Sequence, residues 1–215
     1  MLKDKMIKLA YCNVENLNLK KGYELVSKNR KDKIDFYRFE KDKKLSCGAY
    51  LLLKKLLSEK NISNPVFKSE KYGKTYISNH ENVYFNLSHS GKMVLCAISD
   101  MEVGVDIEYI DDEIDLNIAK QYFYNREYES IMNAENRPDE FFKYWVLKES
   151  YMKYTGLGFH LKLDSFEIVV EDDIKLKNDN GNLKFNLFNI KNYKIGIASH
   201  YGVDNLIEIN VNELY

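Results

Sequence analysis

The chain has 215 residues, 45% hydrophobic and 30% charged, which is enough apolar material to fold around a core rather than remain disordered. Its 32 basic and 33 acidic residues leave a formal net charge of −1, which argues against bulk attraction to nucleic acid or to an anionic membrane. No segment approaches the ~20 apolar residues of a membrane span, and residues 1–12 lack the apolar run of a signal peptide. We therefore expect a cytoplasmic protein without nucleic-acid or membrane partners.

The three cysteines, Cys12, Cys47 and Cys96, are far apart and form no CxxC pair. This usage is typical of reduced, mostly buried thiols in a cytoplasmic protein. The length permits one large domain or two small ones.

Strand and helix patterns alternate through the first part of the chain. Residues 6–12 predict a strand, and the polar, basic residues 23–38 have a helical pattern. Residues 42–59 predict a helix with a broad apolar face. Residues 72–78 predict a loop that enters a short strand. This part of the chain is thus expected to contain both strands and helices.

Two strong strand patterns follow, at residues 93–99 and 103–108. Only Asp100–Glu102 separate them, so we expect the two strands to pair as a hairpin.

The second part of the chain is also predicted to contain both helices and strands. Residues 115–133 predict helical segments, with Asn125 as a cap. Residues 139–156 have the clearest helical pattern, because Pro138 opens it and Gly156 closes it. Three further strands are predicted at 163–170, 183–188 and 193–199.

One internal similarity joins the two parts. LCAIS at 95–99 resembles IGIAS at 195–199, and each follows a long predicted helix. The offset is close to half the chain. We therefore expect an α+β fold (α/β two-layer) with two similar halves related by a pseudo-twofold, each a small sheet packed with a long helix. The halves are predicted at 1–102 and 103–215.

Carboxylates come together in VGVDIE, residues 103–108. Asp106 and Glu108 share one strand face, and Glu149 follows on the long helix. A hard cation such as Mg²⁺ takes a few carboxylates and completes its shell with water and phosphate oxygens. On spacing alone, a pair of solvated acids at a sheet edge remains the alternative.

Basic and aromatic residues surround the helical acid. Lys148 and Lys153 flank Glu149, and Lys153 lies four residues after it, on the same helix face. Trp145 lies four residues before it. Either this face carries an ordinary surface ion pair, or it meets another element or a ligand.

The segment FNLSHSG, residues 85–91, presents Ser88 and His89 before a strand. Adjacent residues of an extended segment point to opposite sides, which disfavours a Ser–His nucleophile pair. Hydroxyls and one imidazole suit phosphate binding better, and a plain polar turn remains open.

Two basic segments are also ambiguous from the residues alone. YGKT contains Gly73 and Lys74 but is too short for a phosphate-binding GxxxxGK[ST] loop. SKNRKDK contains Arg30 and Lys33, which form either a solvated helix face or a grip on a phosphate.

The order of these segments is more specific than any one of them. FNLSHSG, then VGVDIE, then FFKYWVLKESYMKYTGLGF (141–159) resembles the signature of the 4′-phosphopantetheinyl transferases of the surfactin-synthetase type. YGKT matches a fourth, looser block, and the resemblance spans roughly residues 10 to 200. It implies transfer of phosphopantetheine from coenzyme A (CoA) to a serine of an acyl or peptidyl carrier protein, with Mg²⁺, releasing 3′,5′-ADP. It also implies two similar halves and a monomer.

The resemblance also implies a catalytic set. Asp106, Glu108 and Glu149 match the Mg²⁺ ligands, and Glu149 is the candidate that deprotonates the carrier serine, directly or through a water on the metal. Lys153 matches a lysine that contacts the CoA diphosphate. Glu127 and Trp145 are expected in supporting roles.

The remaining CoA contacts that the resemblance implies come from both halves. Matched positions are Arg30, Lys33, Gly73, Lys74, Ser88, His89 and Lys148. Two positions depart from the family pattern: Thr75 replaces a proline, and Leu45 stands where an arginine is usual. Lys44 or Lys43 is then the expected substitute, although a lysine cannot reproduce the bidentate fork of an arginine.

Carrier binding is expected in residues 110–130, through Leu116 and Phe123, against an acidic and apolar recognition helix of the carrier. The alternative is that these side chains pack onto the second half. Two other functions remain alternatives: a catalytically degenerate CoA- or carrier-binding protein, and a carboxylate-metal nuclease, which shares the acids but for which the chain lacks a broad basic surface.

Overall fold

The computed structural model describes residues 7–203 and 205–215. The predicted first strand is confirmed from Ile7, while Met6 lies outside the described residues. The elements of the first half are β1 (Ile7–Asn13), α1 (Leu19–Leu25), α2 (Lys28–Phe36), α3 (Glu40–Glu59), β2 (Phe67–Ser69), β3 (Thr75–Ile77), β4 (Tyr84–Ser90) and β5 (Met93–Ser99).

The second half begins with β6 and ends with β10, and a short tail follows. Its elements are β6 (Val103–Tyr109), α4 (Asn117–Tyr122), α5 (Asn125–Asn133), α6 (Arg137–Thr155), the 3₁₀ turns η1 (Gly158–His160) and η2 (Leu163–Ser165), β7 (Ile168–Val170), β8 (Ile174–Leu176), β9 (Lys184–Ile190) and β10 (Tyr193–Ser199). The tail contains β11 (Leu206–Glu208) and η3 (Val211–Leu214).

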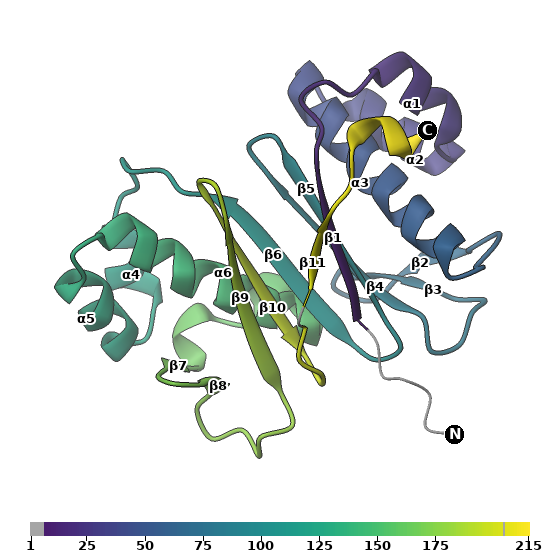
Figure 1. Ribbon diagram of the computed structural model, residues 1–215. Coiled ribbons are helices and arrows are strands. Elements are labelled where there is room, and N and C mark those ends of the chain that lie inside the picture. Colours follow the sequence, from purple (N-terminus) through teal and green to yellow (C-terminus); the bar gives the residue numbers. More distant parts are fainter. Residues whose placement is uncertain (1–6, 204) are drawn as a thin grey trace.

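Two main sheets organise these elements. The first has the order β11-β1-β5-β4 and packs against α3, and the second has the order β6-β10-β9 and packs against α6. Figure 1 shows the sheets in the middle of the molecule, with α1 to α3 on one side and α4 to α6 on the other. The predicted α+β class with two similar halves is thereby confirmed.

The internal repeat extends beyond the similarity seen in the sequence. β4 pairs with β5 and β9 pairs with β10 in the same antiparallel register, offset by one hundred residues. Both outer strands contain Phe-Asn-Leu, at 85–87 and 185–187. The Asn86 side chain accepts from the Val105 N–H at 3.0 Å, and Asn186 accepts from the Val203 N–H at 3.1 Å. In each half, the asparagine of the outer strand thus accepts a hydrogen bond from the backbone of the segment that follows the sheet.

The predicted hairpin between residues 93–99 and 103–108 is wrong. β5 pairs with β1 and β4, whereas β6 pairs with β10 in the other sheet. The short segment Asp100–Glu102 therefore crosses between the sheets. The partner of β5 is β4, whose residues Tyr84–Ser90 read as a polar segment because hydroxyl and imidazole side chains alternate with the apolar ones.

Two predicted boundaries also change. Residues 163–165 form a 3₁₀ turn, so only the end of the predicted strand 163–170 is β7. The tail returns to the first half, where β11 pairs in parallel with β1, and Ile209 and Leu214 are buried in that half's core. Residues 206–208 therefore extend the sheet of the first half, while Leu206 also packs against the cluster that contains Val105 and Ile195 of the second half.

Helix α6 lies close against the backbone of the second sheet. A Cβ atom on Gly104 would lie 2.0 Å from the Ser150 carbonyl oxygen, and one on Gly196 would lie 2.4 Å from the Val146 carbonyl oxygen. Asn136 caps the start of the helix by accepting from the Asp139 N–H, and Gly156 ends it at φ 72°, which glycine adopts without strain. The close contact holds the side chains of α6 against β6.

The three cysteines are free and buried, as expected. Burial raises the pKa of the Cys12 thiol to about 12 and that of Cys47 to about 11. Among the described residues, none of the helices combines the length and the apolar character needed to cross a membrane.

Candidate active site

Strands β4 and β6 lie side by side at the junction of the halves, and side chains rather than a backbone ladder connect them. The Ser88 hydroxyl donates to Asp106 Oδ1 at 2.8 Å, and the Ser90 hydroxyl donates to Glu108 Oε2 at 2.6 Å. Ser90 also accepts from the Tyr109 N–H at 3.1 Å. Two serines spaced two apart on one strand thus face two acids spaced two apart on the other.

Helix α6 adds a cation and a third acid to this pair of strands. Lys153 Nζ donates to Asp106 Oδ1 at 2.6 Å and to Ser88 Oγ at 3.0 Å. Glu149 lies one turn earlier on the same helix face. The predicted grouping of Asp106, Glu108, Glu149 and Lys153 therefore holds in the structure.

The three acids repel one another. Burial and the negative charge of Asp106 raise the pKa of Glu108 to about 7, with a smaller contribution from Glu149. Burial and Asp106 also raise the pKa of Glu149, which Lys153 partly offsets. One buried and two partly buried carboxylates with one nearby ammonium form a site that favours additional positive charge.

Two oxygen atoms test whether these residues suit a divalent cation. Asp106 Oδ2 and Glu149 Oε1 are buried and have no hydrogen-bond partner among the described residues. Unsatisfied buried carboxylate oxygens are the donors that Mg²⁺ takes. As the side chains stand, no three His, Cys, Asp or Glu residues within 7–203 and 205–215 enclose a metal position. The donor set nonetheless fits a hard cation in its chemistry.

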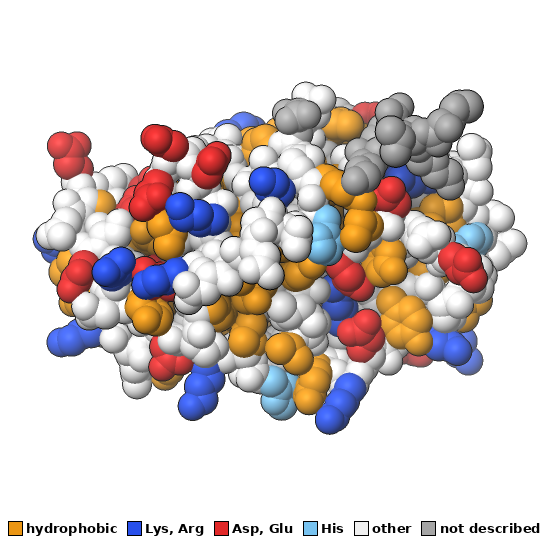
Figure 2. Space-filling model, turned by 90° about the horizontal axis from the view of Figure 1, so that it is seen from below, with side chains coloured by type: hydrophobic (Ala, Val, Ile, Leu, Met, Phe, Trp, Pro, Cys, Tyr) orange, Lys and Arg blue, Asp and Glu red, His pale blue; other side chains and the backbone are white. Residues whose placement is uncertain are grey.

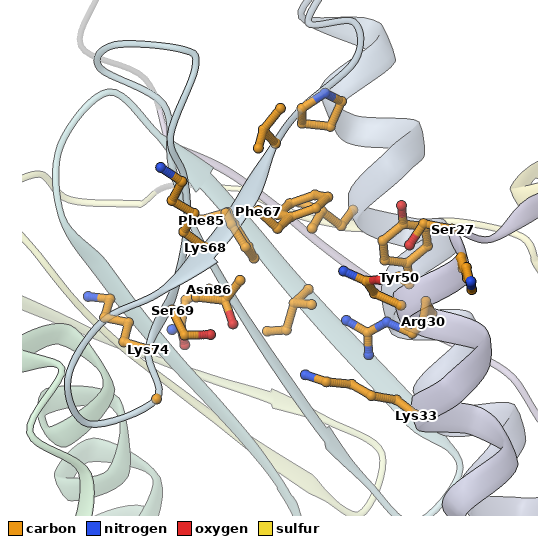
Figure 3. Close-up of a pocket in the computed structure, with 18 of the residues that line it drawn as sticks. Ser27, Arg30, Lys33, Tyr50, Phe67, Lys68, Ser69, Lys74, Phe85 and Asn86 are labelled. Carbon is orange, nitrogen blue, oxygen red and sulfur yellow. The ribbon is translucent and has the colours of Figure 1, made fainter.

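A cavity of about 660 Å³ leads away from Lys153 into the first half (Figure 3). Its basic lining residues are Lys28, Arg30, Lys33, Lys68, Lys74 and Lys153. Figure 3 shows Arg30 and Lys33 extending from α2 into this space, with Phe67 and Phe85 on the other side. The cavity combines positive charge with apolar and aromatic walls, which suits a phosphorylated ligand that carries a flat ring.

Arg30 and Lys74 are held in place at two sides of the cavity. The Arg30 guanidinium lies 5.1 Å from the centre of the Tyr50 ring and donates to Ser46 Oγ at 3.4 Å. Lys74 Nζ donates to the Tyr154 carbonyl oxygen at 2.8 Å and to Glu102. Gly73, at φ 91°, and Thr75 also line the cavity. The predicted loop around Gly73 and Lys74 is therefore part of the cavity wall.

His89 follows Ser88 on β4 and is exposed at its side of the site. Desolvation, and next the positive charge of Lys153, lower its pKa, while Asp106 and Asp42 act in the opposite direction. These interactions place His89 near both the acids and the start of α3.

Lys148 is buried within the second half and does not line the cavity, which contradicts its predicted role as a CoA contact. Its side chain is fully buried, and its ammonium pairs with Glu127 Oε2 at 2.8 Å. It also donates to the carbonyl oxygens of Leu163 and Phe166, both at 2.8 Å. All three donor hydrogens are thus used inside the second half, away from the cavity.

Glu127 has a supporting role in the fold. Its carboxylate accepts from the N–H groups of Tyr124 and Ile168, in addition to pairing with Lys148. The desolvation of this pair raises the pKa of Glu127 and lowers that of Lys148. The pair ties α5 to α6 and to β7, and it forms no part of the cavity lining.

The aromatic side chains near α6 belong to the core. Trp145 stacks on Phe123 and Phe141, with ring centroids 6.1 and 5.7 Å apart. Phe123 is buried, so the prediction that it contacts a carrier protein is wrong. Leu116 is partly buried and packs against the same core. Most apolar side chains of residues 110–130 therefore pack onto the second half, which was the alternative to carrier binding.

Leu45, which stands where an arginine is usual, and Lys44, its predicted substitute, both lie on α3. Leu45 is buried in the core of the first half. Lys44 donates to the Glu15 carbonyl oxygen at 3.1 Å and pairs with Glu40, and it does not line the cavity. The predicted substitution of a missing arginine by Lys44 is thus not supported by its position.

Several residues of the site were missed in the sequence. Tyr50, Lys68, Ser69 and Asn86 line the cavity, and Ser90, one of the hydroxyls of FNLSHSG, forms a hydrogen bond with Glu108 that was not predicted. The repeated two-residue spacing of Ser88 and Ser90 against Asp106 and Glu108 was the available signal. Lys68 and Tyr50 had none, because only the folded chain brings α3 and β2 to one cavity.

Comparison with known proteins identifies the family. A family model described as "4'-phosphopantetheinyl transferase, N-terminal" matches residues 15–101, and one described as "4'-phosphopantetheinyl transferase superfamily" matches residues 102–198. The chain is 39% identical to 4′-phosphopantetheinyl transferase gsp of Aneurinibacillus migulanus over 66% of this chain and 61% of that protein. It is 38% identical to the transferase Sfp of Bacillus subtilis (strain 168), over 50% of this chain and 48% of that protein.

The chain thus spans about half to three fifths of the length of these relatives. A longer match is to 4′-phosphopantetheinyl transferase ffp of Bacillus subtilis, 32% identical over 69% of this chain and 68% of that protein. Taken with the two family models, this match shows that the chain belongs to the 4′-phosphopantetheinyl transferase family.

Proposed function

We propose that this protein transfers 4′-phosphopantetheine from CoA to a serine of an apo acyl or peptidyl carrier protein, with release of 3′,5′-ADP. The observation that carries the proposal is the adjacency of the acid site and the cavity. Asp106, Glu108 and Glu149 gather at one end, and the basic cavity extends from Lys153 into the first half. A ligand with phosphates at the acid site and a flat ring in the cavity fits this arrangement.

CoA is proposed to lie along the cavity. Arg30, Lys33 and Lys74 carry the charge to bind its phosphates, and Tyr50 and Phe67 offer apolar surface to the adenine. Lys153, which donates a hydrogen bond to Asp106, is proposed to contact the diphosphate at the end of the cavity beside the acids. Ser88 and His89 are proposed contacts at the same end. The half 1–102 then binds most of CoA, and 103–215 supplies most of the reacting groups.

Asp106, Glu108 and Glu149 would hold Mg²⁺, which when bound neutralises charge on the diphosphate. Glu149, whose pKa is raised, accepts the proton from the serine hydroxyl. The serine oxygen forms a bond to the phosphorus that carries the pantetheine arm, and the bond from this phosphorus to the bridging oxygen breaks. The ammonium of Lys153 stabilises the negative charge that develops on the leaving 3′,5′-ADP.

The test is modification of a carrier protein. The purified chain is incubated with CoA, Mg²⁺ and a panel of apo carrier proteins, and the mass of each carrier is measured. We expect one carrier or more to gain a single phosphopantetheine group, and expect Glu149→Gln to abolish the gain while leaving CoA binding measurable by calorimetry. A folded chain that binds CoA but modifies no carrier would instead support the non-catalytic alternative. We further propose that the protein acts as a monomer in the cytoplasm.

A further inference from the structure

The loop between α2 and α3 carries exposed aromatic side chains that the core does not use. Phe36 is 89% exposed and Phe39 is 56% exposed, and Tyr37 between them is also exposed. Large aromatic side chains on a surface are costly to hydrate, and a contiguous group of them marks a contact site. Neither phenylalanine lines the cavity that the proposed CoA site occupies.

The same loop is surrounded by positive charge. Residues 36–44 contain four Lys or Arg and two Asp or Glu, although the whole chain has a formal net charge of −1. Arg38 and Lys41 are exposed, and neither forms a salt bridge with a described residue. The Arg38 guanidinium lies 5.5 Å from the centre of the Phe39 ring. This surface therefore offers apolar contact and uncompensated positive charge together.

The loop leads into α3, which packs against β4, the strand that carries Ser88 and His89. Asp42, in the first turn of α3, is close enough to His89 to influence its pKa, and His89 adjoins Ser88, which contacts Asp106. A second hollow of about 720 Å³ borders the loop, with Tyr23, Ile34 and Arg38 among its lining. By contrast, Figure 2 shows charges of both signs mixed among hydrophobic side chains on the face seen from below.

We infer that Phe36, Arg38, Phe39 and Lys41 form a docking surface for an acidic region of the carrier protein. The inference rests on the proposed function and extends it to a surface of the first half. The charge of the surface selects the occupant: an acidic partner gains from Arg38 and Lys41, whereas a second copy of this chain would bring the same positive charges together. Phe36 and Phe39 supply the apolar anchor of the contact.

Two double variants test the surface, both in the full chain. Phe36→Ser with Phe39→Ser removes the anchor, and Arg38→Glu with Lys41→Glu reverses the charge. Lys175→Glu with Lys191→Glu is the control, because it makes the same charge change at exposed positions of the second half. Thermal unfolding and the Kd for CoA are measured for each, and both are expected to match the parent chain, since the four residues lie outside the cavity.

The kinetic result decides the inference. We expect each surface variant to raise the KM for the carrier by about tenfold or more with kcat unchanged, and the charge variant to lose most of its salt dependence. The control is expected to stay within about twofold of the parent. A carrier KM that is equal in the parent and in both surface variants overturns the inference and leaves the proposed function intact.

Two other outcomes are distinguishable. If the parent chain modifies no carrier, the proposed function fails, and calorimetry with apo carrier then decides: binding that both surface variants lose supports the docking surface, and no binding by the parent overturns it. Sedimentation measures self-association. A parent dimer that Phe36→Ser with Phe39→Ser converts to a monomer would assign the surface to a second copy and overturn the inference.

Discussion

Lys153 Nζ lies 2.6 Å from Asp106 Oδ1, which links helix α6 to strand β6 within the second half, beside Ser88 of the first half. Asp106 is buried, and the lysine is partly exposed toward the cavity. One ammonium group therefore compensates a carboxylate that is also repelled by Glu149 and Glu108. The contact places a positive charge between the acids and the space proposed for the diphosphate.

Lys153→Met should lower kcat for carrier modification by about 10²-fold, because charge on the leaving group loses a fixed partner. Lys143→Met is the matched control on the same helix, since Lys143 contacts Glu140 and the Tyr144 ring and does not line the cavity. It should keep the parental rate. A Lys153→Met protein as active as that control would show that the contact with Asp106 serves the fold alone.

The buried ion pair of Lys148 and Glu127 should contribute to the stability of the fold. Lys148→Met leaves the Glu127 carboxylate buried without its cation, and should lower the free energy of unfolding by about 3–5 kcal/mol in a urea titration. The double variant Lys148→Met with Glu127→Leu should recover part of that loss. Equal destabilisation by the single and double variants would contradict the pairing.

Glu108 gives a pH-dependent prediction in the absence of divalent cations. Its pKa is raised from 4.5 to about 7, so the folded chain retains a proton that the unfolded chain releases. The stability from this group is therefore complete below pH 4.5 and is lost as the pH rises to about 7.

Glu108→Gln removes this titration. In a chelator, the Tm of the variant minus that of the parent should increase between about pH 5 and about pH 8. A difference that is constant or decreases over this range would contradict the raised pKa. Addition of Mg²⁺ with CoA at the higher pH should raise the Tm of the parent more than that of the variant.

Arg30 should contribute to CoA affinity. Arg30→Gln keeps a polar side chain in the cavity but removes the charge held over Tyr50. We expect the Kd for CoA, measured by calorimetry, to rise about tenfold, which corresponds to about 1.4 kcal/mol. Lys20→Gln, an exposed change outside the cavity, is the control. An unchanged Kd for Arg30→Gln would remove Arg30 from the proposed CoA site.

The sequence predicts elements well where local pattern decides them. Residues 93–99 and 193–199 are strands over the predicted ranges, and the long helix ends at Gly156 as expected, because period, caps and glycine act within a few residues. The pairing of strands is not local. Asp100–Glu102 is short enough for a hairpin, yet β6 pairs with β10 in the second sheet. That partner lies far away in the sequence, so a local pattern does not identify it.

For the site, too, the sequence predicts what local spacing decides and misses contacts between distant segments, as the side chains of α6 show. Glu149 and Lys153 were placed correctly because the spacing of a helix puts them on one face. Lys148, one residue before Glu149, is turned by about 100° around the helix and is buried against Phe166 and Glu127. Its neighbours come from segments that the helical pattern does not identify. Phe123 was assigned to the surface for the same reason.

The measurement that tests the account most directly is the mass of an apo carrier protein after incubation with CoA and Mg²⁺, with the parent chain and with Asp106→Ala. Asp106 contacts Lys153 and Ser88 and raises the pKa of both other acids. We predict that the parent chain adds one phosphopantetheine group, and that Asp106→Ala adds none while its circular dichroism spectrum is unchanged. Modification by Asp106→Ala at the parental rate would contradict the account.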